Sequence, residues 1–164
     1  MKRIYPYIFP AIALVFVIFL VFRWYNLRTQ DGEISPFGEG VEIENLSKEE
    51  AERVLKGSGD FKTVELSGDD FVGQVRYEVR DSKVRFSVTA NLPVLDKGAY
   101  QVWLKEVGGD FKSKAFTLDY GKAGFVGSAA IGKDSLPFEV IVSKELMEDN
   151  ILEEELLKGV VPQE

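Results

Sequence analysis

The side chains in this sequence that could do chemistry are mostly carboxylates. The chain has 164 residues, with 27 Asp and Glu against 20 Lys and Arg, and it contains neither histidine nor cysteine. It therefore lacks the usual general base, the usual transition-metal ligand and every thiolate chemistry, zinc thiolate sites and disulfides included. This composition leaves open an acid–base pair of carboxylates.

Turns and solvent-exposed surface explain the acidic clusters more simply than metal binding or catalysis does. Asp69-Asp70 follows Ser67-Gly68 and could bind calcium, which takes about six to eight oxygen ligands, but Asp and Gly also form turns between strands, which we favour. The run Glu153–Glu155 is interpreted as a solvated face, and Gly57–Asp60 lacks the Gly-Lys-Ser/Thr ending of a phosphate loop. We expect no catalytic residue, no cofactor and no metal.

Gln101 and Trp103 are the candidates for partner binding. They alternate with Tyr100, Val102 and Leu104, so the two sets should lie on opposite faces of one strand. If the apolar set faces the core, Trp103 is either exposed as a platform for a ligand or covered, for example by a helix. The large apolar area of tryptophan favours the covered alternative.

A membrane anchor is predicted ahead of this strand. Residues 4–22 carry no charge, and Lys2 and Arg3 precede them. Nineteen helical residues span roughly 28 Å, close to the ~30 Å hydrocarbon core of a bilayer. The apolar run ends without the small residues of a cleavage site, which favours an uncleaved signal anchor over residues 1–25 rather than a cleaved signal peptide.

The flanking charges set the expected orientation. The short N-terminus should lie in the cytoplasm and the remaining chain outside, although Arg23 and Arg28 weaken that preference and leave the reverse orientation open. The part beyond the anchor holds 16 basic and 27 acidic residues, a net charge of −11. This charge disfavours nucleic acid and anionic lipid headgroups as partners of the domain. We therefore expect two partners, which are the membrane, contacted through residues 4–25, and another protein.

The elements that must position these residues follow from local patterns. A linker is predicted at residues 26–45, because they contain acidic residues and several glycines. The folded domain should then comprise residues 46–164. Ser47 and Glu50 fit a capping box, and Gly57 fits a helix stop, so a short amphipathic helix should lie between them.

From Phe61 onward, alternating apolar residues and intervening turns predict an all-β fold. The spacing is that of a sandwich or a barrel, and we expect a seven-stranded antiparallel, immunoglobulin-like β-sandwich. The segment 151–161 fits either a short helix or an edge strand. The expected strands are 61–66, 71–80, 84–88, 100–104, 111–118, 125–131 and 138–142.

Part of this region resembles a known family. The motifs are Asn91-Leu92-Pro93, then Gly98–Leu104 with its Tyr-Gln-Val-Trp-Leu run, then Phe116-Thr117-Leu118, and finally Phe138–Ser143 with Glu145 after it. With the tail at 150–153, they are similar to the C-terminal extracytoplasmic domain of anti-sigma-K-type factors. The resemblance implies a β-sandwich held outside the membrane by one helix.

The chain departs from that family ahead of the helix. Those factors carry a sigma-binding, often zinc-binding domain on the cytoplasmic side, where this sequence has about three residues and no His or Cys. The resemblance therefore implies fold and topology rather than inhibition of a sigma factor. We expect an extracytoplasmic binding or sensing module without catalysis; the alternatives are a structural subunit of an envelope, secretion or pilus assembly, and an enzyme that uses carboxylates alone.

The anchor prediction has a direct test by cell fractionation. We expect the chain to stay in the membrane fraction at full length, because residues 4–22 are long enough to span the bilayer. Protease added outside the cytoplasmic membrane should digest the C-terminal domain. A soluble form that begins near residue 25–30 would indicate a cleaved signal peptide, and protection of the domain in spheroplasts would indicate the reverse orientation.

Overall fold

The computed structural model describes residues 41–57, 59–147, 149 and 151–163, together with Val17 and Phe37. The chain divides into two units, residues 1–34 and 35–164. No helix among the described residues is long and apolar enough to cross a membrane. Apart from Val17, the predicted anchor lies outside the described residues, so it stays a prediction.

The all-β fold is confirmed, and each of the seven expected strands is present in the described part of the chain. Two short strands, β1 and β7, were not expected, and the ambiguous segment 151–161 contains strand β10. The strands are β1 (Glu44–Asn45), β2 (Lys62–Ser67), β3 (Val72–Arg80), β4 (Lys83–Asn91), β5 (Ala99–Glu106), β6 (Lys112–Thr117), β7 (Asp119–Gly121), β8 (Gly124–Gly132), β9 (Phe138–Glu145) and β10 (Glu154–Val161).

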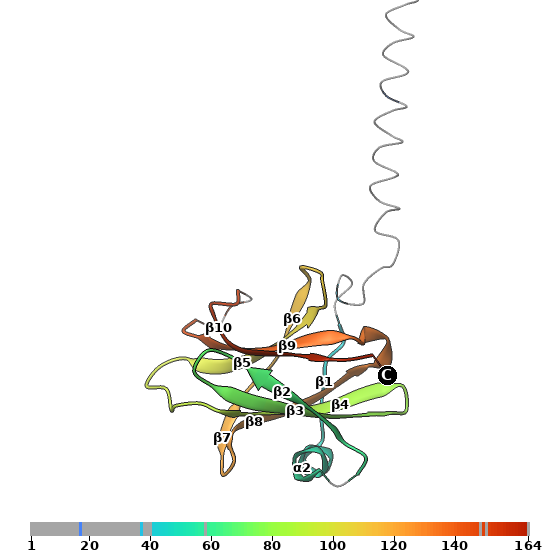
Figure 1. The fold of residues 1–164 in the computed structure, drawn as a ribbon, viewed down its shortest axis with the longest axis horizontal. Helices are drawn as coiled ribbons and strands as arrows, with labels where there is room; N and C mark the ends of the chain where they lie inside the picture. Colours follow the sequence, from blue (N-terminus) through green and yellow to red (C-terminus); the bar gives the residue numbers. More distant parts are fainter. Residues whose placement is uncertain are drawn as a thin grey trace, which may run out of the picture. The chain divides into compact units, whose positions relative to one another are not determined.

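The expected seven-stranded sandwich is wrong, because the strands form one sheet. Among the described residues this antiparallel sheet has ten strands in the order β1-β8-β4-β3-β2-β10-β9-β5-β6, with β7 beside β8. Strand β10 makes the difference, since it pairs with β9 along its length and with β2 through Lys158 and Ser67. It joins what would otherwise be two separate sheets into one curled sheet (Figure 1).

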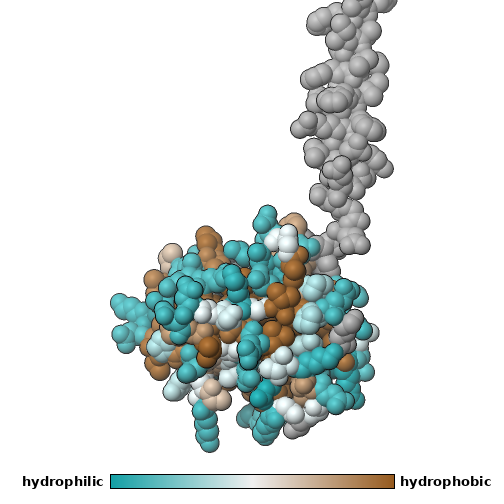
Figure 2. Space-filling view, in the orientation of Figure 1, coloured by the Kyte–Doolittle hydropathy of each residue, from teal (hydrophilic) through white to brown (hydrophobic). Residues whose placement is uncertain are grey.

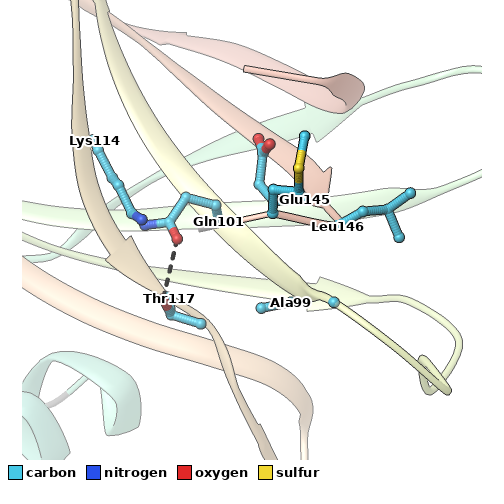
Figure 3. A pocket seen from close by; sticks show the side chains of 8 residues that line it. Ala99, Gln101, Lys114, Thr117, Glu145 and Leu146 are labelled. Carbon is cyan, nitrogen blue, oxygen red and sulfur yellow. Dashed lines mark hydrogen bonds between the residues drawn. The ribbon is translucent and has the colours of Figure 1, made fainter. Parts of the chain in front are cut away.

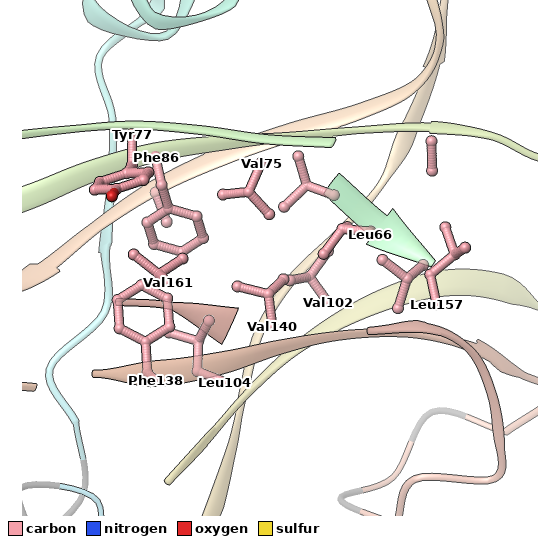
Figure 4. Close-up of a cluster of buried hydrophobic side chains, with 14 of the residues drawn as sticks. Leu66, Val75, Tyr77, Phe86, Val102, Leu104, Phe138, Val140, Leu157 and Val161 are labelled. Carbon is pink, nitrogen blue, oxygen red and sulfur yellow. The ribbon is translucent and has the colours of Figure 1, made fainter. Parts of the chain in front are cut away.

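The core lies between the two facing halves of the curled sheet. Figure 4 shows side chains from β2, β3 and β4 meeting those from β5, β9 and β10. Phe86 stands 5.7 Å from Phe138 and 5.8 Å from Phe116, centroid to centroid. At Gly127 a Cβ atom would collide with the ring of Phe116, so this glycine lets β6 close over β8.

The inward face of β5 was predicted correctly. Tyr100, Val102 and Leu104 are all buried in the core. The Tyr100 hydroxyl donates to the carbonyl oxygen of Pro93 at 2.9 Å, and burial raises the pKa of this phenol, with a smaller contribution from the charge of Glu154.

The expected short helix is confirmed as α2 (Lys48–Lys56). The Ser47 hydroxyl accepts from the Glu50 N–H, the Glu50 carboxylate accepts from the Ser47 N–H, and Gly57 ends the helix with φ 66°. Its buried residue, Val54, faces the sheet, and the helix packs on β3, β4 and β8.

Polar contacts hold α2 on the sheet. Arg53 pairs with Glu78, and the Arg76 guanidinium donates to the Leu55 carbonyl oxygen at 2.9 Å. A nine-residue helix is marginal by itself, so these contacts and the burial of Val54 must stabilise it. The β unit also includes residues before 46, since β1 pairs with β8 and Phe37 is buried in the core.

The assignment of faces in β5 predicts opposite effects of two neighbouring substitutions. Leu104→Ala should lower the free energy of unfolding by about 2–5 kcal/mol, because it leaves a cavity in the core. Lys105→Ala should cost under about 0.5 kcal/mol, since its side chain lies on the outer face and its ion pair with Glu139 is 3.8 Å long. Urea unfolding of both variants measures the difference, and a larger cost for Lys105→Ala would contradict the assignment.

Candidate functional site

Gln101 and Trp103, the two candidates from the sequence, lie together on the outer face of β5. Only 3% of Gln101 and 2% of Trp103 is exposed to solvent. Trp103 is therefore covered, as the large apolar area of its ring favours, and it is no open platform. Helix α2 packs on β3, β4 and β8, in the other half of the sheet.

Trp103 belongs to a buried polar network. Its indole Nε1–H lies 2.9 Å from Ser143 Oγ and 3.2 Å from Glu145 Oε1. The Ser143 hydroxyl donates to the same carboxylate, and the Glu153 N–H approaches Glu145 Oε2 at 3.2 Å. The carboxylate thus accepts from three donors in the described part of the chain, so this buried polar group is hydrogen-bonded.

The register of β5 and β9 assembles this network. Gln101 is opposite Ser143, and Ala99 is opposite Glu145. Alternation along β9 then places Ser143 and Glu145 on the same outer face as Gln101 and Trp103. The Leu146 N–H donates to Glu153 Oε2 at 2.7 Å, so the segment that links β9 to β10 is held at both ends.

An irregularity in the pairing of β5 with β6 adds the remaining polar groups. Thr117 is opposite Gln101, but the register shifts between Val102 and Trp103, so Lys114 comes to lie opposite Trp103. Such a bulge changes the direction of the side chains that follow it. Thr117 shares the face of Gln101 because the two residues are directly opposite, and Lys114 reaches the same face because of the shift.

These residues surround a hollow of about 320 Å³ on the outer face. Figure 3 shows the Lys114 side chain running toward the Gln101 amide, whose oxygen is hydrogen-bonded to Thr117. We call this the Gln101 hollow. Its lining residues are Gly98, Ala99, Gln101, Lys114, Thr117, Glu145, Leu146 and Met147.

The amide of Gln101 has an unsatisfied end. Its Oε1 accepts from the Thr117 hydroxyl at 3.0 Å, whereas its Nε2 is buried and has no hydrogen-bond partner among the described residues. A buried polar group in this state costs about 1–3 kcal/mol.

The surroundings of the hollow are basic on one side and apolar on the other. Lys114 lines it, and Lys112 Nζ lies 6.0 Å from the centroid of the Trp103 ring, within range of a cation–π interaction. Leu146 and Met147 form the apolar side and are 64% and 66% exposed. Figure 2 shows that apolar patches interrupt the hydrophilic surface on one face of the β unit.

The acidic residues considered in the sequence lie elsewhere. Asp69 and Asp70 are exposed between β2 and β3, where the turn interpretation places them. No group of three or more Asp and Glu among the described residues could hold a metal ion. In the run 153–155, Glu154 forms an ion pair with Lys144, and Glu155 forms one with Lys158. Glu153, in the segment between β9 and β10, instead forms hydrogen bonds with Glu145 and Leu146.

Sequence reasoning missed Ser143, Glu145, Lys114 and Thr117 as members of the site. The first two had a usable signal, because they alternate with the apolar Val140 and Val142 in a strand pattern. In β6, Thr117 lies between Phe116 and Leu118, so alternation could have found it too, whereas Lys114 had no such signal because its position depends on the bulge.

Trp103 fluorescence tests the buried network. In the full chain with Trp24→Phe, Trp103 is the remaining tryptophan, and acrylamide should quench it only weakly. Glu145→Ala should lower the free energy of unfolding by about 1–3 kcal/mol and increase quenching, because Trp103 and Glu153 lose their acceptor. Glu154→Ala, which removes an exposed ion pair, is the control and should cost at most about 1 kcal/mol. Strong quenching in the parent chain would contradict the burial.

No family model, curated protein or solved structure matches this chain. The likeness to anti-sigma-K-type factors therefore rests on the sequence motifs between Asn91 and Glu153 alone.

Proposed function

We propose that this protein is a single-pass, membrane-anchored binding or sensing module without catalytic activity, and that its partner occupies the Gln101 hollow. The β unit lies outside the cytoplasmic membrane in this proposal, and the partner is another protein. The observation that carries it is the buried Nε2 of Gln101, which has no hydrogen-bond partner among the described residues and belongs to a residue that lines the hollow.

An unsatisfied donor at this position favours ligand binding over a purely structural role. The groups around it, Trp103, Ser143 and Glu145, satisfy one another. An acceptor from a partner would remove the cost of the unpaired donor. Because Gln101 sits in a strand with paired neighbours on both sides, it is held in position before the partner arrives, which limits the entropy lost on binding.

The same geometry disfavours catalysis. The carboxylate of Glu145 is occupied by three donors, and Ser143, which donates to it, is buried with no exposed surface. Among the lining residues, Glu145 is the one with a carboxyl group. Hydrolysis of a glycoside needs two carboxyl groups about 5–10 Å apart. With no histidine in the sequence, no imidazole can activate a hydroxyl.

The membrane part of the proposal rests on the sequence. The uncharged run 4–22 with Lys2 and Arg3 before it supports an anchor with the N-terminus inside. The excess of acidic residues beyond the anchor supports a protein partner over nucleic acid. The likeness to the extracytoplasmic domain of anti-sigma-K-type factors supports the same arrangement.

One observation favours the alternative of a structural subunit in a larger assembly. Strand β6 ends the sheet order of the described strands, and Phe111 just before it is 55% exposed. An open edge strand can pair with a strand of another chain. This role would place the contacts along β6 and leave the Gln101 hollow unused.

Site-specific photo-crosslinking separates the two functions. A benzoylphenylalanine at position 147, on the rim of the hollow, should crosslink to the partner in intact cells, and Gln101→Leu should abolish the product. The same residue at position 111, on the β5–β6 turn, is the matched control and should give no such product. Crosslinks from position 111 alone would support assembly through the edge. Crosslinks from position 147 that survive Gln101→Leu would contradict binding in the hollow.

A further inference from the structure

We infer that the Gln101 hollow binds a carboxylate carried on an apolar body, such as the C-terminal carboxylate of a partner chain that ends in an apolar residue. This inference rests on the proposed function and names the chemistry of the group that is bound. It follows from three features of the hollow: an unpaired donor, a cation and an apolar rim.

The unpaired donor sets the first requirement. Gln101 Nε2 carries two N–H groups and no partner among the described residues, while Oε1 of the same amide is held by Thr117. The ligand must therefore bring a hydrogen-bond acceptor to this point.

The cation sets the second requirement. Lys114 lines the hollow, and no acidic side chain in the described part of the chain pairs with it. Figure 3 shows its side chain running toward the Gln101 amide. A carboxylate has two acceptor oxygens, so one can accept from Gln101 and the other from the Lys114 ammonium in a charge-assisted hydrogen bond. A neutral carbonyl group would leave the ammonium without a counter-charge.

Glu145 does not oppose an anion as strongly as its charge suggests. Its oxygens already accept from the Trp103 indole, the Ser143 hydroxyl and the Glu153 N–H. In Figure 3 its carboxylate also points away from Thr117. These hydrogen bonds hold the Glu145 carboxylate in the network with Trp103 and Ser143.

The rim sets the third requirement. Leu146 and Met147 line the hollow, and Ile151 follows on the same β9–β10 segment with 67% of its surface exposed. The hydrogen bonds between Glu145, Leu146 and Glu153 hold this segment in place. An apolar side chain beside the carboxylate would cover these residues, and the removal of apolar surface from water would stabilise the complex.

The size of the hollow limits the ligand. Its volume of about 320 Å³ is at the lower end of the ~300–1,000 Å³ of small-ligand sites. It suits one residue-sized group rather than an extended cofactor.

The test measures binding of defined probes by isothermal titration calorimetry to the full chain in nanodiscs. The probes are N-acetyl-Ala-Leu with a free carboxylate, the same dipeptide as its C-terminal amide, hexanoate and inorganic phosphate. We expect the free acid to bind at least tenfold more tightly than the amide, because the amide offers no charge to Lys114. We expect phosphate to bind more weakly than the acid, since it cannot use the apolar rim.

Matched variants locate the site. Lys114→Met and Gln101→Leu should each weaken binding of the acid at least tenfold. Lys105→Met also removes a lysine from the outer face, but this residue does not line the hollow, so binding should be unchanged. Lys114 lies on an edge strand, so its variant should fold even if Gln101→Leu does not.

Binding of the dipeptide acid alone assigns a peptide C-terminus as the source of the carboxylate, and binding of hexanoate alone assigns a small apolar acid. Equal binding of acid and amide, equal binding of phosphate and acid, no binding of any probe, or no effect of Lys114→Met would each overturn the inference. Crosslinking from position 147 that depends on Gln101 would still support the proposed function in those cases.

Discussion

The close approach of β2 and β10 is the constraint on which the rest of the β unit depends. At Gly68 a Cβ atom would collide with the carbonyl oxygen of Leu156, and at Gly159 it would lie 2.7 Å from the carbonyl oxygen of Glu65. Glycine at both positions allows the two backbones to meet, so the sheet continues from one half to the other and curls over a single core. The same strand β10 fixes the far end of the segment whose Leu146 forms part of the rim of the hollow.

The parts of the fold that could be predicted are those that local patterns determine. Alternation identified the inner face of β5, and the pair Ser47 and Glu50 with Gly57 identified the ends of α2. The arrangement of the strands could not be predicted, because it depends on β10. Its glutamates and leucines fit a helix or a strand equally well, and nothing local shows that Lys158 will pair with Ser67.

The site shows the same division. Period-two alternation placed Gln101 and Trp103 on one face, and it could have added Ser143 and Glu145 from β9. Lys114 lay beyond such reasoning. Regular pairing of β5 with β6 would put it opposite Leu104, whose side chain enters the core, and only the register shift after Val102 brings it opposite Trp103 on the outer face. A single bulge thus decides whether the hollow contains a cation.

An unpaired buried polar atom is not by itself a binding site, and the described residues offer a comparison. Besides Gln101 Nε2, the buried side-chain atoms without a partner among them are Arg53 Nε and Ser87 Oγ. Arg53 belongs to α2 and is already bonded to Glu78, and Ser87 belongs to β4, on which α2 packs. Gln101 differs because this residue lines a hollow together with Lys114 and the exposed apolar side chains of Leu146 and Met147. The conjunction of these features, rather than the unsatisfied donor, gives the hollow a defined ligand chemistry.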